Sequence, residues 1–330
     1  MRAVALITPT YSADLERFAL LCDSIDRHVT GYERHYVIVT EDDMPYFAQF
    51  CRAHRVVTPC SQLLPRWLRL APSWLRREDR RLWWSLRSRP VNGWHVQQLL
   101  KVAATLQLPE QRFCMIDSDN VFIRSFDVGA YAGGDLTPLY QKRAAITADA
   151  PLHTKWTHNC DNLLGLKQTV FPADDYVDPV IVWDQRTVHD MTRAIERATG
   201  RSWVHALCST RDFSEYLLYG HFVRSSPEHL AAHKITTESL ANTYWQGAPL
   251  DTAAVTAMVN STSALKVVLC IQSFTRTPVS IIRDVVGLSQ RRTEPATTPG
   301  SPTIFGRDQH EPMKFPEQHS SVAYSKETRC

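Results

Sequence analysis

The first 120 positions of the chain alternate between short apolar runs and amphipathic stretches. Apolar runs at 4–7, 36–39 and 113–116 have the length and composition of strands buried on both faces. A shorter run at 56–57 predicts another strand between them. Further along, the same pattern predicts strands at 144–148 and 267–272.

Between these runs, apolar residues recur every three to four positions, which is typical of helices packed on one face. The clearest case begins at Asp14, with one face formed by Leu15, Phe18, Ala19, Cys22 and Ile25. Four more helices are expected, at 44–52, at 93–108, at 185–199 ending at Gly200, and at 213–219 ending at Gly220.

This alternation predicts an α/β fold with a mixed, mostly parallel sheet flanked by helices. Residues 1–287 are expected to form one domain, because the 44% hydrophobic fraction is enough for a large core. Residues 288–330 are rich in Thr, Pro, Ser, Glu and Gln, so we predict a disordered tail.

Charge and cysteine content narrow the possible partners and the compartment. The net charge of +3 is mild and gives no reason to expect nucleic acid as a partner. Neither a signal peptide nor an apolar run of about 18 residues is evident. The eight scattered cysteines fit reduced thiols, so we expect a cytoplasmic protein.

Residues 61–90 differ from the rest of the chain because eight arginines interleave with four tryptophans. One interpretation is a helical insertion whose tryptophans pack back on the domain. The other is a basic surface for anionic lipid headgroups or for an acidic acceptor, and contact with lipid would place the protein at the inner surface of the membrane.

The strongest chemical signal is the sequence Asp117-Ser118-Asp119, which directly follows the predicted strand at 113–116. Side chains at i and i+2 of an extended segment point the same way, so the two carboxylates can share one cation. Open parallel sheets bind ligands at the carboxyl ends of their strands. Mn²⁺ or Mg²⁺ is the expected cofactor, since both prefer oxygen ligands. The alternative is a turn with solvated aspartates.

Several segments, in this order, resemble bacterial glycosyltransferase-A-type proteins and, more narrowly, the DUF6492 family. The resemblance spans roughly residues 3–285. It implies a Rossmann-like fold and transfer of a sugar from a nucleotide-sugar donor to an acceptor such as a surface glycan. The matching segments are Thr8-Pro9-Thr10-Tyr11, Gly93-Trp94 with Gln97-Gln98 and Lys101, Asp117-Ser118-Asp119, Phe213-Ser214-Glu215-Tyr216 with Leu218-Tyr219-Gly220, and Ile271-Gln272-Ser273 before Thr277-Pro278.

The resemblance implies where the donor would bind. Thr8, Thr10 and Tyr11 would contact the base and ribose, although the two threonines could equally be ordinary turn residues. Gln97 and Lys101 share a helix face, and Lys101 would face a phosphate. The alternative for Lys101 is an exposed lysine on a surface helix.

The same resemblance suggests a third metal ligand and a catalytic base. His221 is the first candidate for the third ligand and His233 the second, although a lone histidine is often structural. Glu215 or Asp212 could deprotonate an acceptor hydroxyl. Both are also ordinary residues for the start of a helix.

Two other functions remain open at this point. A haloacid-dehalogenase-type phosphatase would use Asp117 as nucleophile and Asp119 as acid/base. Two earlier strand–helix units, and the lack of a GDxxxD-like cluster downstream, count against it. A non-catalytic protein that binds nucleotide sugars is the second alternative.

Overall fold

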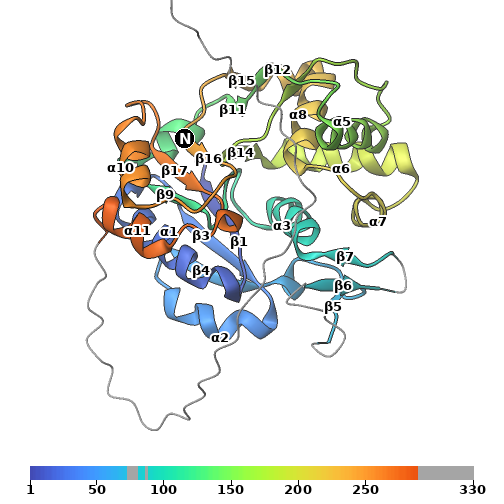
Figure 1. Ribbon diagram of the computed structural model, residues 1–330. Coiled ribbons are helices and arrows are strands. Elements are labelled where there is room, and N and C mark those ends of the chain that lie inside the picture. Colours follow the sequence, from blue (N-terminus) through green and yellow to red (C-terminus); the bar gives the residue numbers. More distant parts are fainter. Residues whose placement is uncertain (73–80, 86–87, 289–330) are drawn as a thin grey trace, which may run out of the picture.

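The computed structural model describes residues 1–72, 81–85 and 88–288, and it is a mixed α/β structure built on one five-stranded sheet (Figure 1). The strand order is β14-β8-β1-β3-β4. Four strands are parallel, and β14 runs antiparallel to β8, so the predicted mixed, mostly parallel sheet is confirmed. The strands are β1 (Val4–Pro9), β3 (Arg34–Val39), β4 (Arg55–Pro59), β8 (Arg112–Ile116) and β14 (Val180–Asp184).

The register of the sheet brings the ends of β1 and β8 together. Ile7 pairs with Met115 across these parallel strands, so Thr10 and Asp117 follow at the same edge. The chain adds β3 and β4 on one side of β1 and then places β8 on the other side. The strand order therefore reverses at β1. In open α/β sheets such a switch point leaves a crevice where ligands bind.

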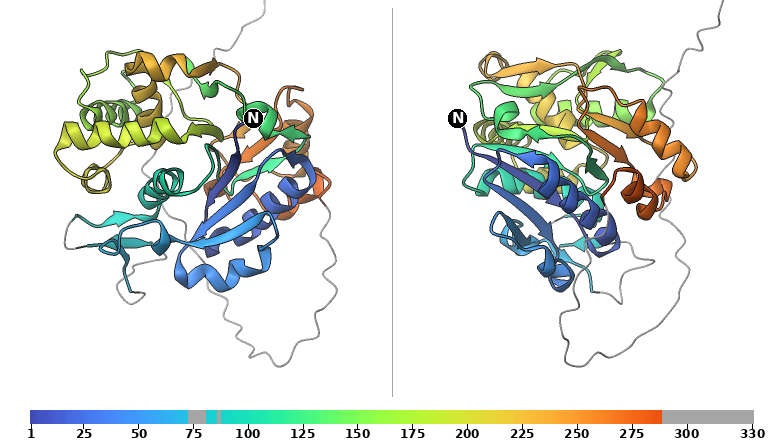
Figure 2. Two further views of the ribbon diagram at one scale, coloured as in Figure 1. Left: turned by 180° about the vertical axis from the view of Figure 1, so that it is seen from behind. Right: turned by 90° about the vertical axis from the view of Figure 1, so that its left-hand side faces the viewer.

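Alternate residues of the central strands face two separate cores. Leu6 of β1 packs with Phe18 of α1 in one core, and Ile7 packs with Leu99 of α3 in the other. The sheet is therefore covered on both faces, which explains why its strands are apolar throughout (Figure 2). The helices α1 (Leu15–His28) and α2 (Met44–Phe47) lie on the first face, and α3 (Gly93–Gln107) lies on the second.

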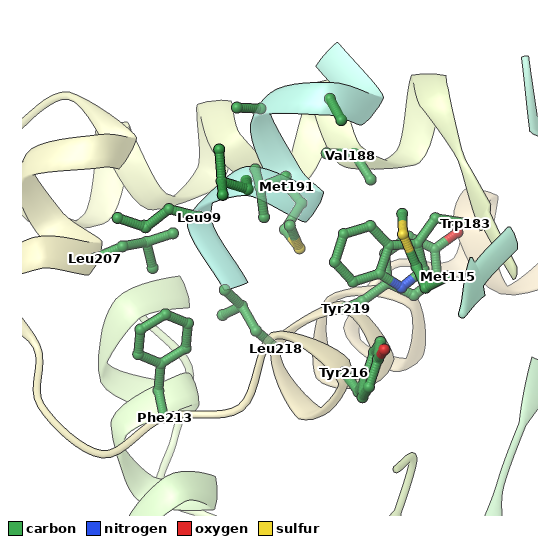
Figure 3. Close-up of a cluster of buried hydrophobic side chains, with 14 of the residues drawn as sticks. Leu99, Met115, Trp183, Val188, Met191, Leu207, Phe213, Tyr216, Leu218 and Tyr219 are labelled. Atoms are coloured by element: carbon green, nitrogen blue, oxygen red, sulfur yellow. The ribbon is translucent and has the colours of Figure 1, made fainter. Parts of the chain in front are cut away.

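The second core extends beyond the sheet into a group of helices. Trp183 of β14 stacks on Tyr219 with a centroid separation of 5.4 Å and an interplanar angle of 15°. Figure 3 shows these rings beside Met115, and Met191 and Leu207 belong to the same core. The helices are α5 (Pro151–Leu164), α6 (Gln185–Thr199), α7 (Trp203–Ser209), α8 (Glu215–Ser225) and α9 (Pro227–Ala231).

A third layer is added by the last part of the described chain. Its three-stranded sheet joins β16 (Ala241–Tyr244), β17 (Val268–Ile271) and β9 (Asn120–Phe122), so it continues directly from the Asp117-Ser118-Asp119 segment. The helices α10 (Thr252–Asn260) and α11 (Val279–Val285) cover it. Arg17 of α1 fixes this layer by donating to the carbonyl oxygens of Ile271 and Thr277, both at 2.9 Å.

Short elements complete the fold. The remaining strands are β2 (Val29–Thr30), β5 (Arg69–Leu70), β6 (Leu82–Trp84), β7 (Val91–Asn92), β10 (Phe126–Asp127), β11 (Thr137–Tyr140), β12 (Lys142–Ile146), β13 (Ala173–Asp175) and β15 (His233–Thr236). The short helix α4 (Val128–Ala132) lies between β10 and β11.

Two expectations about secondary structure are wrong. The helix expected to end at Gly220 continues to Ser225, because Gly220 is an interior position that lets the ring of Tyr176 approach. The expected helical insertion at 61–90 is not found in the described residues. Apart from a 3-10 turn at Cys60–Gln62, they supply β5 and β6 of the antiparallel sheet β5-β6-β7. In this sheet Trp83 is buried, whereas Trp84 is 42% exposed.

Two other expectations fall partly or wholly outside the described residues. Residues 289–330 of the predicted tail are not described, and Leu288, the last described residue, is buried against α11 and its neighbours. The arginines and tryptophan at 74, 76, 77, 80 and 87 also lie outside the described residues.

Candidate functional site

Asp117 and Asp119 lie at the carboxyl edge of the central sheet in two different environments. The side chain of Asp117 is 46% exposed, whereas that of Asp119 is 14% exposed. The turn between β8 and β9 is held by Asn120, whose side-chain amide donates to the carbonyl oxygen of Asp117 at 3.0 Å. On the other side, Ile271 N–H donates to the carbonyl oxygen of Asp119 at 3.1 Å.

Asp119 has an incomplete set of partners. Its Oδ1 atom is shielded from solvent and accepts no hydrogen bond within the described chain, and the nearest cation is Arg17 at 3.9 Å. Burial, and then the neighbouring carboxylate of Asp14, raise the pKa of Asp119 to about 7. Burial likewise raises the pKa of Asp14 to about 6, although Ser118 donates to its carboxylate at 3.3 Å. The site therefore has more buried negative charge than its own residues neutralise.

The buried ammonium of Lys101 balances the negative charge of Asp117. Its ammonium lies 3.0 Å from Asp117 Oδ1 and 3.0 Å from Glu215 Oε1, and it donates to Tyr216 Oη at 2.8 Å. Burial alone would lower the pKa of Lys101, but the groups of Asp117, Tyr216 and Glu215 outweigh it and hold that pKa well above its usual range. We call Lys101, Asp117, Glu215 and Tyr216 the Lys101 cluster.

Capping residues in the local sequence explain how α3 and α8 position the side chains of the Lys101 cluster. The Asn92 side chain caps α3 by accepting from His95 N–H at 2.8 Å, and the Ser214 side chain caps α8 by accepting from Leu217 N–H. Glu215 is thus the first residue of α8, and its N–H donates to Gln98 Oε1 of α3 at 3.1 Å. The middle of α3, at Gln98 and Lys101, is therefore joined to the first turn of α8.

The residues expected to bind the donor differ in their burial and in the contacts that they already make within the chain. Thr8 is fully buried, and its hydroxyl pairs with His35 Nε2 at 3.0 Å, inside the sheet rather than at its edge. Thr10 lies at the edge, and its buried hydroxyl has no partner among the described residues. Tyr11 is partly exposed, with the guanidinium of Arg81 5.0 Å from its ring centre. Gln97 is partly exposed, one helical turn before Lys101.

The two histidines proposed as third ligands have other partners. His221 Nδ1 lies 2.8 Å from Asp161 Oδ1 of α5, and its ring contacts Tyr176. In the described part of the chain, no hydrogen bond or ion pair joins His221 to Asp117 or Asp119. Both ring nitrogens of His233 are occupied, by the carbonyl oxygen of His229 at 2.6 Å and Tyr219 Oη at 2.8 Å.

The two candidate bases are also placed apart. Glu215 is 6% exposed and lies within the Lys101 cluster. Asp212 precedes α8 with a left-handed backbone (φ 55°), and its carboxylate pairs with Lys155 of α5. Only Glu215 is therefore linked to Asp117 by the contacts of the structure.

Four residues that sequence patterns did not single out belong to this edge: Asp14, Arg17, Arg81 and Tyr216. Arg81 pairs with the buried Asp43, in the 3-10 turn that follows β3, and donates to Ser12 Oγ at 3.2 Å. Tyr216 stood within a matched segment, but its partner Lys101 is 115 positions away, so only folding reveals the contact.

The residues present fit a divalent cation. Asp119 offers a shielded oxygen that has no hydrogen-bond donor among the described residues, and Asp117 offers a half-exposed carboxylate two residues away. Within the described ranges, no group of three or more His, Cys, Asp or Glu side chains is arranged to hold a metal. A cation here would take its remaining ligands from a diphosphate and water, as Mg²⁺ commonly does.

Fold and site together define the class: an α/β protein with an open, mostly parallel sheet and a cluster of carboxylates at its carboxyl edge. The chain belongs to the DUF6492 family, described as a family of unknown function, whose model matches residues 2–290. Comparison with curated proteins gives no match. Among the described helices, none is both long enough and apolar enough to cross a membrane.

Proposed function

We propose that this chain is a metal-dependent glycosyltransferase of the glycosyltransferase-A type, which moves a sugar from a nucleotide-sugar donor to a glycan or related acceptor. The observation that carries the proposal is the pair Asp117 and Asp119 at the switch point of the sheet. The carboxylate of Asp117 faces solvent, and that of Asp119 keeps a shielded oxygen without a partner in the described part of the chain. This arrangement suits a cation that would link the protein to a ligand at this edge of the sheet.

The charge of the site supports a dication as the missing partner. Four carboxylates (Asp14, Asp117, Asp119 and Glu215) surround two cations (Arg17 and Lys101). When all six groups are ionised, this set carries a net charge of −2. Mn²⁺ or Mg²⁺ would neutralise that charge, and the donor diphosphate would then supply oxygen ligands.

Each residue has a distinct part in this proposal. Asp117 and Asp119 hold the cation, which when bound neutralises charge on the departing nucleoside diphosphate. Thr10 and Tyr11 lie at the end of β1, where the nucleoside would enter the crevice. Glu215 is too deeply buried to meet an acceptor directly, so we assign it to the Lys101 ammonium rather than to proton transfer.

The test is release of nucleoside diphosphate from a panel of sugar nucleotides, with Mn²⁺, with Mg²⁺ and with a chelator. Cation-dependent turnover should fall at least about 100-fold in Asp117→Ala and Asp119→Ala, because a charge clamp acts mainly on the transition state. Asp117→Asn should behave like Asp117→Ala, since it keeps the shape and removes the charge. Asp135→Asn, at an exposed aspartate, is the matched control and should retain activity.

The alternatives give different results in the same assays. A phosphatase would hydrolyse simple phosphomonoesters and form a covalent phospho-aspartate at Asp117. A non-catalytic binding protein would show a Mn²⁺-dependent thermal shift with sugar nucleotides but no turnover. Full Mn²⁺-dependent activity in both alanine variants would refute the proposed site.

A further inference from the structure

The ammonium of Lys101 has no hydrogen left for a ligand. It has three N–H donors, and they are directed to Asp117, Glu215 and Tyr216 at 3.3, 3.0 and 2.8 Å. The side chain is 4% exposed, so water does not compete for these contacts. For Lys101 to bind a phosphate oxygen, it would first have to release one of these three acceptors.

Asp117 is the acceptor that can be released most easily. Its side chain is 46% exposed, whereas Glu215 is 6% exposed and Tyr216 is buried. Glu215 is further fixed by its N–H, which donates to Gln98 of α3. The buried half of the Lys101 cluster is therefore rigid, and the solvent-facing half has room to move.

We infer that Asp117 is shared between Lys101 and the cation, so that cation binding at Asp117 and Asp119 requires Asp117 to leave the Lys101 ammonium. This inference rests on the proposed function, because it assumes the cation site. It makes Lys101 an internal competitor of the cation. It also makes Glu215 and Tyr216 positioning residues, because they accept hydrogen bonds from the Lys101 ammonium when Asp117 leaves it.

The inference predicts opposite signs for neighbouring substitutions. Lys101→Met removes the competitor, so Mn²⁺ should bind roughly fivefold more tightly. Among the described residues, Glu215→Gln leaves Lys101 with Asp117 as its one charged partner, so Mn²⁺ should bind roughly fivefold more weakly. The affinity is measured by electron paramagnetic resonance of free Mn²⁺ and by titration calorimetry, without any substrate.

The variant Tyr216→Phe distinguishes the exchange of Asp117 between Lys101 and the cation from simple charge effects. It removes an acceptor of Lys101 without changing any charge. Exchange predicts Mn²⁺ binding weaker by about two- to threefold, whereas charge effects through space predict no change. The double variant Lys101→Met/Glu215→Gln keeps the net charge and leaves no unpaired buried ion, so it covers the case in which Lys101→Met does not fold. It should bind Mn²⁺ more tightly than the wild-type protein.

Two variants serve as matched controls. Lys167→Met removes an exposed lysine and Tyr46→Phe removes an exposed phenol, and both should bind Mn²⁺ as the wild-type protein does. If the wild-type protein binds no Mn²⁺, the inference fails together with the proposed function. If it binds Mn²⁺ but the double variant binds no more tightly, or Tyr216→Phe is unchanged, the inference fails and the proposed function stands.

Discussion

At the scale of single residues, the site contains buried polar atoms that lack hydrogen-bond partners within the described chain. Asp119 has a shielded oxygen without a donor, and Thr10 has a buried hydroxyl without a partner in the described chain. Most buried polar atoms in native proteins are hydrogen-bonded, so such groups cost stability. They are tolerated where a ligand completes them, and functional sites are often less stable than the surrounding structure.

This trade-off gives a prediction for Asp119→Asn. Without added cation, the variant should be more stable than the wild-type protein by about 1 kcal/mol, because it removes a poorly solvated carboxylate. With Mn²⁺, the wild-type melting temperature should rise and that of the variant should not. Thermal unfolding with and without Mn²⁺ measures both effects. A variant that is destabilised and still responds to Mn²⁺ would contradict the role of Asp119.

His233 gives a prediction about pH. It lies in a buried chain of hydrogen bonds, in which Asp184 N–H donates to Tyr219 Oη at 3.0 Å and Tyr219 Oη lies 2.8 Å from His233 Nε2. Burial lowers the pKa of His233 to about 4, from an ordinary value of 6.5. The unfolded chain therefore takes up this proton at a higher pH than the folded protein does. This contribution to stability is present above pH 6.5 and is lost as the pH falls from 6.5 to 4.

The shift corresponds to at most about 3 kcal/mol of unfolding free energy. Imidazole ¹⁵N chemical shifts of the folded protein should show His233 still neutral at pH 5.5. The exposed His54 serves as an internal comparison in the same spectra. A midpoint near 6.5 for His233 would show that burial does not hold this imidazole neutral.

At the scale of elements, close packing decides where helices continue. Gly220 lies inside α8, and a Cβ atom there would lie 2.2 Å from the Tyr176 ring. In an exposed helix, Gly→Ala stabilises by about 1 kcal/mol. At this position we expect Gly220→Ala to destabilise by about 1–3 kcal/mol instead, because the ring must be displaced.

Urea unfolding of Gly220→Ala measures this effect, and Tyr176→Ala provides the control. In the Tyr176→Ala background the same glycine substitution should become neutral or stabilising, since the ring is gone. If Gly220→Ala stabilises the otherwise unchanged protein, the close contact between α8 and Tyr176 is not a constraint on the fold.

At the scale of the whole molecule, positive charge is concentrated in one part of the chain. Residues 61–90 contain eight arginines and two acidic residues, a net charge of +6, whereas the chain carries +3, so the rest carries −3. On β5-β6, exposed Arg69 lies directly opposite exposed Trp84. We keep the proposal that this face contacts anionic lipid headgroups, because basic and aromatic side chains together favour the membrane surface.

This proposal is tested by co-sedimentation with vesicles. Binding to vesicles with about 30% anionic lipid should exceed binding to neutral vesicles and should fall with added salt. The variant Arg66→Glu/Arg69→Glu should lose this binding. The matched control is Arg143→Glu/Lys234→Glu on β12 and β15, at the opposite end of the molecule (Figure 1). Equal loss in both variants would indicate an effect of net charge and not of this face.

The sequence by itself determined the elements whose signals are local. The run at 113–116 predicts β8 because four adjacent apolar residues need burial on both faces, and 185–199 matches α6 because Asp184 caps its start and Gly200 ends it with φ 66°. The placement of Thr10 and Asp117 at one edge of the sheet also followed from sequence, since the carboxyl ends of parallel strands share that edge.

Only the tertiary structure decided which residues meet across long separations. Lys101 and Tyr216 share a hydrogen bond because the start of α8 packs against the middle of α3, and His233 is occupied because Tyr219 reaches it. The continuation of α8 through Gly220 and the antiparallel direction of β14 likewise depend on packing partners elsewhere in the chain. The physical reason is that side-chain pairing and burial are properties of the assembled core, whereas periodicity and capping are properties of neighbouring residues.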